Sequence, residues 1–143
     1  MLHGRRLNKT KAQKAVSKND WLDALKHYSD CVELEPEDHL NWSNRAAAQR
    51  QLGLFEEMLA DAKKATEVKP DFVKGWWRIG QANLALERLD EAEEALRHGL
   101  ELDPENANCT ECLDSVEKAR VEDEDDFDKL LKQLKALDPT QLR

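Results

Sequence analysis

The prolines of this chain fall at a fixed interval. Pro36, Pro70 and Pro104 lie 34 residues apart, and a period of that length is typical of an array of small supersecondary units. Other positions keep the same period and the same chemical character. The small set is Ala12, Ala46 and Gly80; the large apolar set is Trp21, Phe55 and Leu89; a second apolar set is Leu34, Val68 and Leu102; the acidic set is Glu37, Asp71 and Glu105. The chain is therefore predicted to fold as a repeat protein.

Each unit is predicted to contain two helices. The first helices cover about 5–17, 38–52 and 72–86, and the second helices cover about 21–34, 55–68 and 89–102. Each proline ends a second helix, since proline lacks an N–H and clashes with the preceding turn. The small residues at the Ala12 position let paired helices approach closely. The fold class is all-α, a solenoid of three helix pairs.

Composition narrows the class of protein. Charged residues make up 36% of the 143 residues and there are only 5 glycines, which favours helices over strands. The net charge of −8 argues against a nucleic-acid partner, and no apolar run reaches the roughly 20 residues that a membrane span needs. Three cysteines suit a compartment where thiols stay reduced. We expect a cytoplasmic protein.

The repeat resembles the tetratricopeptide repeat (TPR), whose 34-residue unit carries Trp, small residues, large apolar residues and Pro at fixed places. The resemblance covers residues 5–104, about 70% of the chain, divided into units of about 5–37, 38–71 and 72–104. It departs from the family pattern at Lys11 and Arg45, where Leu is preferred. The resemblance implies a right-handed superhelical solenoid in which the first helix of each unit lines a concave groove.

The stretches NKTKAQKA, WSNRAA and VKGWWR also resemble the dicarboxylate clamp of the Hsp70- and Hsp90-binding co-chaperones of the Hop/Sti1 type. That clamp holds the C-terminal Glu-Glu-Val-Asp of the chaperones through Lys, Asn, Asn, Lys and Arg. The resemblance implies a peptide-binding site made of Lys9, Gln13, Asn44, Lys74 and Arg78. Gln13 replaces the first Asn of the pattern, which keeps the amide donor on a longer arm.

Trp77 stands beside these residues and has two interpretations. By the 34-residue step it corresponds to Lys9 and Ser43, which places it on the groove wall, against the apolar residue upstream of a bound carboxylate and stacked on Arg78. Alternatively it packs on its neighbours, towards Gln81 or the seventh helix, which is predicted after Pro104. Trp76, by contrast, corresponds to Trp42 and is expected between paired helices.

No enzyme, cofactor or metal site is expected. The pair Cys109 and Cys112 is a single CxxC, whereas a structural zinc site needs four ligands, so both cysteines are interpreted as packing residues. The four histidines are scattered. No nucleophile–base set and no phosphate-binding loop is visible.

The chain after Pro104 is predicted to have two parts. Residues 105–120 form a capping helix that covers the third unit. Residues 121–143 form an acidic linker, with six acids and no base in 121–128, followed by an amphipathic helix over 126–137. Its apolar row is expected to fold back on the solenoid; the alternatives are that it pairs with another molecule or stays free.

Two functions follow. The first is an adaptor, or co-chaperone, whose groove clamps the C-terminal peptide of Hsp70 or Hsp90, in a chain expected to be a monomer. The second is a TPR scaffold for an internal peptide motif or a partner helix, assembled through the C-terminal amphipathic helix. Loss of affinity on amidation of the peptide distinguishes the first from the second.

Overall fold

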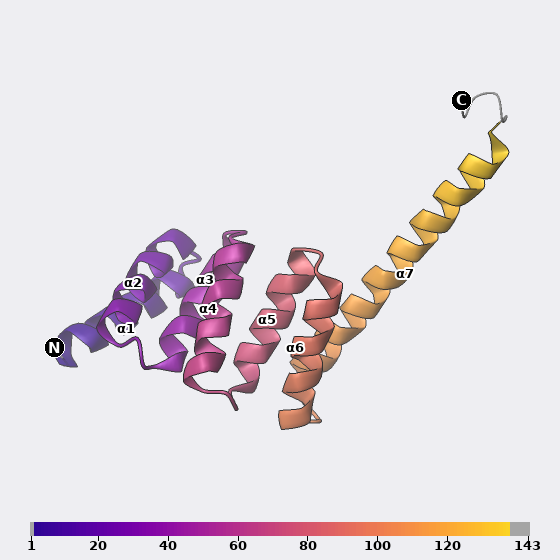
Figure 1. Ribbon diagram of the computed structural model, residues 1–143. Helices are drawn as coiled ribbons and strands as arrows, with labels where there is room; N and C mark the ends of the chain where they lie inside the picture. The colour runs from indigo at the N-terminus through magenta and orange to yellow at the C-terminus, as the bar shows by residue number, and fades with distance from the viewer. Residues whose placement is uncertain (1, 138–143) are drawn as a thin grey trace.

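The computed structural model describes the backbone of residues 2–137 and the side chains from Arg6 onward, and these residues form seven helices. They are α1 (Leu2–Ser17), α2 (Trp21–Leu34), α3 (His39–Gln51), α4 (Phe55–Val68), α5 (Val73–Ala85), α6 (Leu89–Leu102) and α7 (Ala107–Ala136). The first six make three antiparallel pairs stacked side by side (Figure 1). The predicted solenoid and the predicted helix pairs are confirmed.

The turn inside each pair repeats a single backbone device. Asn19, Gly53 and Glu87 stand 34 residues apart and all have a positive φ, of 58°, 73° and 61°. This left-handed conformation ends the first helix of each pair and reverses the chain. The three units therefore repeat in backbone conformation as well as in sequence.

Small residues bring the helices of a pair together, as predicted. Ala12 and Ala46 are fully buried, and a Cβ added at Gly80 would lie 2.5 Å from the Leu96 side chain. The buried residues form three clusters, one for each helix pair with its next neighbour. The middle cluster, for example, joins Met58 and Leu59 of α4 to Ile79 of α5.

The repeat tryptophans tie each loop to the helix that follows it. Trp42 and Trp76 are half-buried, and their indole N–H groups donate to the carbonyl oxygens of Pro36 and Pro70, at 2.7 and 2.8 Å. The same contact, repeated 34 residues later, explains why a tryptophan stands six residues after each of these two prolines. Trp76 also packs on the core and on the ring of His98.

The C-terminal segment differs from the prediction. α7 is one continuous helix of 30 residues, so no acidic linker separates a capping helix from a further helix. Neither Gly nor Pro occurs between Ala107 and Ala136. Asp125 and Asp128 stand four residues before Lys129 and Lys132, a spacing that supports a helix.

The predicted fold-back of the tail is wrong for the described residues. Cys109, Cys112, Leu113 and Val116 are buried against α6, which confirms the capping role of the first half. Residues 121–137 are all exposed, and this half of α7 leaves the solenoid as a straight rod (Figure 1). A return to the solenoid would require a break that the sequence does not provide. Residues 138–143 of the expected segment lie outside the described residues.

Candidate peptide-binding groove

Helices α3, α5 and α7 form the inner layer of the solenoid. α3 contacts α5 and α5 contacts α7, in addition to the contacts between consecutive helices. A cavity of about 510 Å³ lies on this layer. Its lining comes from α3 and the start of α4 (Arg50, Gln51, Phe55), from α5 (Trp77, Gln81, Leu84, Ala85) and from α7 (Asn108, Glu111, Cys112, Ser115).

Arg78 is the most constrained of the predicted site residues. Its guanidinium carbon lies 4.4 Å from the centre of the Trp77 ring, and its Nη1 donates to Oε1 of Gln81 at 3.0 Å. Its Nε is buried without a hydrogen-bond partner in the described part of the chain. The stacking of Trp77 on Arg78, expected from the sequence, is confirmed.

Arg78 has no carboxylate partner in the part of the chain whose side chains are described. Within residues 6–137, Arg78 forms no ion pair. Burial, and then the charge of Arg50, lower the pKa of Arg78 to about 10. The guanidinium still carries its proton at neutral pH, but it does so in a place where a positive charge is unfavourable. An incoming anion would relieve that penalty.

Trp77 packs on its neighbours, as one interpretation predicts, and it also lines the inner cavity. It is half-buried and packs against the cluster of α6 and α7 that contains Leu96 and Val116. Another part of its ring lines the inner cavity beside Phe55 and Leu84. The indole is thus held by the core while it presents apolar surface to the groove.

The other predicted site residues lie on α1, α3 and α5, and their side chains are at least partly exposed. Lys74 stands one turn before Arg78 on α5 and is exposed, with no ion pair within residues 6–137. Asn44 is half-buried on α3, and Gln13 is exposed on α1. The contacts of the structure bring together Trp77, Arg78 and Gln81 of α5, with Arg50 nearby. They do not join this group to Lys9.

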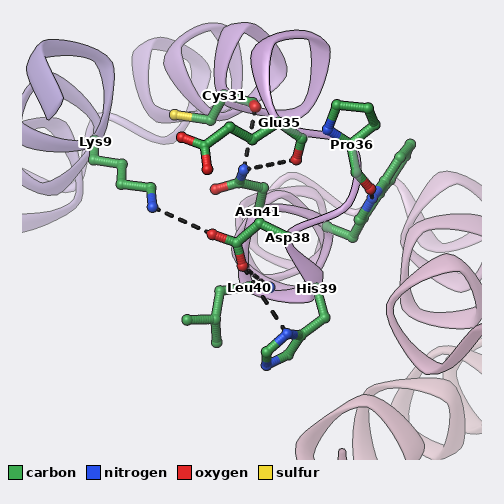
Figure 2. A network of polar contacts seen from close by, with 9 residues as sticks. Lys9, Cys31, Glu35, Pro36, Asp38, His39, Leu40 and Asn41 are labelled. Atoms are coloured by element: carbon green, nitrogen blue, oxygen red, sulfur yellow. Dashed lines mark hydrogen bonds and ion pairs between the residues drawn. The ribbon is translucent and has the colours of Figure 1, made fainter. Parts of the chain in front are cut away.

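Lys9 instead meets an acid of the second unit. Its Nζ lies 3.3 Å from Oδ2 of Asp38, as Figure 2 shows. Asp38 is the N-cap residue of α3, and its other oxygen, Oδ1, accepts the backbone N–H of Leu40 at 3.0 Å. The sequence analysis did not name Asp38, although the predicted helix began there, because the resemblance to the clamp pointed only to Asn44 on that helix.

Two further groove residues were missed. Arg50 corresponds to Val16 and Leu84 at the 34-residue step, so the repeat pattern describes its position as apolar and hides its charge. Gln81 corresponds to Gln13 at twice that step. Because Gln13 was already a candidate, the equivalence was a usable signal for Gln81.

The described residues hold no group of three or more His, Cys, Asp or Glu side chains that would bind a metal ion. Cys31, Cys109 and Cys112 are buried free thiols. Burial raises the pKa of all three, in the case of Cys112 to about 11, so they are poor nucleophiles. In the part of the chain that the structure describes, no helix has the length and apolar character to cross a membrane.

Helix pairs of this period, stacked with a groove on the inner layer, define a repeat-type binding protein. Family models of the tetratricopeptide repeat match residues 41–72 and 73–106. The chain belongs to the tetratricopeptide-repeat family.

Similar proteins are found among the chaperone organizers. The chain is 35% identical over 135 residues, 94% of its length, to "Protein STIP1 homolog" of Dictyostelium discoideum. It is 39% identical over 111 residues, 78% of its length, to the "Hsp70-Hsp90 organizing protein" of Triticum aestivum. These matches span 24% and 19% of the two relatives, so the chain corresponds to about a quarter or less of their length.

Solved structures give the same picture. The TPR2B domain of yeast Sti1, in complex with an Hsp70 peptide, is 28% identical with a TM-score of 0.76, covering 82% of this chain and 98% of that domain. The first TPR of Spaghetti (RPAP3), bound to the HSP90 peptide SRMEEVD, is 26% identical with a TM-score of 0.78, covering 83% of this chain and 94% of the other.

Proposed function

We propose that this chain is a peptide-binding adaptor whose groove clamps the C-terminal carboxylates of an acidic chaperone tail, the Glu-Glu-Val-Asp end of Hsp70 or Hsp90. The observation that carries the proposal is Arg78, a partly buried guanidinium on the inner layer with no acidic partner within residues 6–137 and a pKa lowered to about 10. A cation held in this way is suited to an anionic ligand. The similar domains that hold Hsp70 and Hsp90 peptides support the choice of ligand.

The clamp residues have complementary parts. A C-terminal Asp carries two carboxylates, which take charge-assisted hydrogen bonds worth about 1.5–3 kcal/mol each. Lys74 and Arg78, one turn apart on α5, bind one carboxylate between them and stop repelling each other. Lys9 reaches the second carboxylate, while the amides of Gln13 and Asn44 donate hydrogen bonds without adding charge.

The cavity beside Trp77 receives the residue upstream of the terminus. Phe55, Trp77 and Leu84 give it apolar walls. Arg50 also lines it and is close enough for its charge to act on Arg78. A peptide with a valine before its terminal Asp, and acids before the valine, matches an apolar wall flanked by cations. Trp77 also stacks on Arg78 and fixes the direction of its guanidinium.

A scaffold function is the second candidate, and one observation favours it. The exposed half of α7 and its C-cap residue carry an apolar row made of Phe127, Leu130, Leu131, Leu134 and Leu137, each at least 36% exposed. Such a row is typical of a helix that pairs with another helix. In this function the solenoid holds an internal motif and α7 provides the assembly. Either function describes an adaptor rather than an enzyme, in the cytoplasm, where the buried thiols stay reduced.

Alanine variants test the clamp. Lys74→Ala and Arg78→Ala should each weaken binding of a peptide that ends in Glu-Glu-Val-Asp at least tenfold, from a dissociation constant of about 1 μM in the parent chain, as measured by titration calorimetry. Lys63→Ala removes the same charge from an exposed lysine of α4, which lines a separate cavity between α4 and α6, and should leave the affinity unchanged. Equal affinities for all four proteins would exclude the clamp.

A further inference from the structure

The contact between Lys9 and Asp38 has a consequence for ligand binding. Lys9 is 40% exposed and Asp38 is 22% exposed at the side chain. Ion pairs with this exposure contribute little to stability. Their separation of 3.3 Å is also longer than the 2.7–2.9 Å of a strong charge-assisted bond. The pair therefore has no evident role in holding the fold together.

The position of Asp38 is fixed by the loop that carries it. Its backbone N–H donates to the carbonyl of Glu35 at 3.2 Å. The buried Asn41 donates through Nδ2 to the carbonyl oxygens of Cys31, at 3.2 Å, and of Glu35, at 3.0 Å, which joins the end of α2 to the start of α3 (Figure 2). Trp42 donates to Pro36 in the same loop.

The side chain of Asp38 is fixed as well. Oδ1 caps α3 through the N–H of Leu40, so only Oδ2 faces Lys9, and the carboxylate cannot swing away without uncapping the helix. Lys9, by contrast, has a long flexible stem and three N–H donors. When a ligand arrives, the lysine is free to move and the aspartate is not.

We propose that Asp38 is an affinity-setting residue of the clamp, which competes with the ligand's terminal carboxylate for Lys9. The inference rests on the proposed function. A carboxylate that binds Lys9 must come within a few ångströms of Asp38, and like charges at that distance repel in a half-exposed site. Asp38 thus partly neutralises the first cation of the groove before any ligand binds. It lowers the affinity for an acidic terminus and reduces the salt dependence of binding.

Removal of this one charge is the test. Asp38→Asn and Asp38→Ser both keep an oxygen that caps a helix N-terminus, so two independent variants retain the fold. Each should bind the free-carboxylate peptide about three- to tenfold more tightly than the parent chain, with a steeper loss of affinity in salt. Glu37→Gln is the matched control, because Glu37 is exposed, adjacent in sequence, and has no contact with Lys9. It should change the affinity less than twofold.

The same substitution in a chain that lacks the Lys9 side chain tests the mechanism. In a Lys9→Ala chain, Asp38→Asn should no longer tighten binding, because the lysine for which the two carboxylates compete is absent. Unchanged or weaker binding by both Asp38 variants would overturn the inference, and so would a gain that persists without Lys9. Failure of the proposed function is recognised separately: Arg78→Ala would then leave the affinity for the peptide unchanged in both the parent and the Asp38→Asn chain.

Discussion

At the residue scale, Trp77 links packing to binding. Its ring lies against the α6–α7 cluster on one side and over the guanidinium of Arg78 on the other. Trp77→Ala should therefore weaken peptide binding by about 1–2 kcal/mol and also lower the free energy of unfolding by about 2 kcal/mol, since a half-buried aromatic side chain is lost. Calorimetric titration and thermal unfolding measure the two effects.

A conservative variant separates these two roles of Trp77. Trp77→Phe keeps an apolar ring in the core but offers a weaker face to the cation. It should recover most of the melting temperature while binding stays weaker than in the parent chain. If Trp77→Ala bound the peptide normally, the indole would have a packing role alone.

At the scale of single elements, the left-handed turns are unequal although their position is the same. Glu87 has a φ of 61°, and Gly53, at the equivalent place, has a φ of 73°. A side chain in this region is strained by about 1 kcal/mol. The strain at Glu87 therefore has no counterpart at Gly53.

Exchange of the two residue types should change stability in opposite directions. Gly53→Ala should destabilise the chain by about 1 kcal/mol through backbone strain alone, because an added Cβ would meet nothing within 4 Å. Glu87→Gly should stabilise it by about 0.5 kcal/mol, the gain being reduced by the entropy of glycine in the unfolded chain. Urea unfolding at constant m-value measures both. Shifts of the same sign would show that the turn conformation is not what determines these effects.

The element that the sequence analysis misread is α7. A run of six acids in eight residues was interpreted as a linker. The described helix continues through that run, which contains neither Gly nor Pro and is followed by basic residues one turn later. The first half of α7 was predictable, because its apolar residues continue the pattern of an inner helix. Whether the second half of α7 is exposed depends on where the solenoid ends. The local sequence pattern does not indicate that point.

At the scale of the whole molecule, the exposed half of α7 should be dispensable for the fold. The last packed turn is held by Arg120, whose Nη2 lies 2.8 Å from oxygens of both Asp90 and Glu93. Deletion of residues 121–143 leaves this contact in place. The melting temperature and the peptide affinity should both remain within error of the parent chain, whereas Val116→Ala, in the buried half, should lower the melting temperature.

Light scattering on the parent chain and on the chain that lacks residues 121–143 reports on assembly. If the parent chain is a dimer and the shortened chain a monomer, the exposed row is an assembly surface and the scaffold function gains support. A fall in melting temperature on truncation of a monomeric chain would contradict the extended position of α7.

The 34-residue period was enough to predict six helices to within about three residues at their ends. The inner position of Arg78 and Trp77 was implied by the family resemblance. It was not enough to predict how side chains of different units meet. Lys9 and Asp38 are 29 residues apart in the chain, and Arg50 approaches Arg78 across two helices. Such contacts depend on the superhelical arrangement, so they required coordinates.

The central claim is that the groove recognises a free carboxyl terminus. Titration calorimetry with one peptide ending in Glu-Glu-Val-Asp, free or amidated at its C-terminus, tests it most directly. Amidation removes one carboxylate and its charge-assisted bonds, so we predict micromolar binding of the free peptide and a loss of at least tenfold for the amidated one. Equal affinity for the two peptides would contradict the clamp and support recognition of an internal motif.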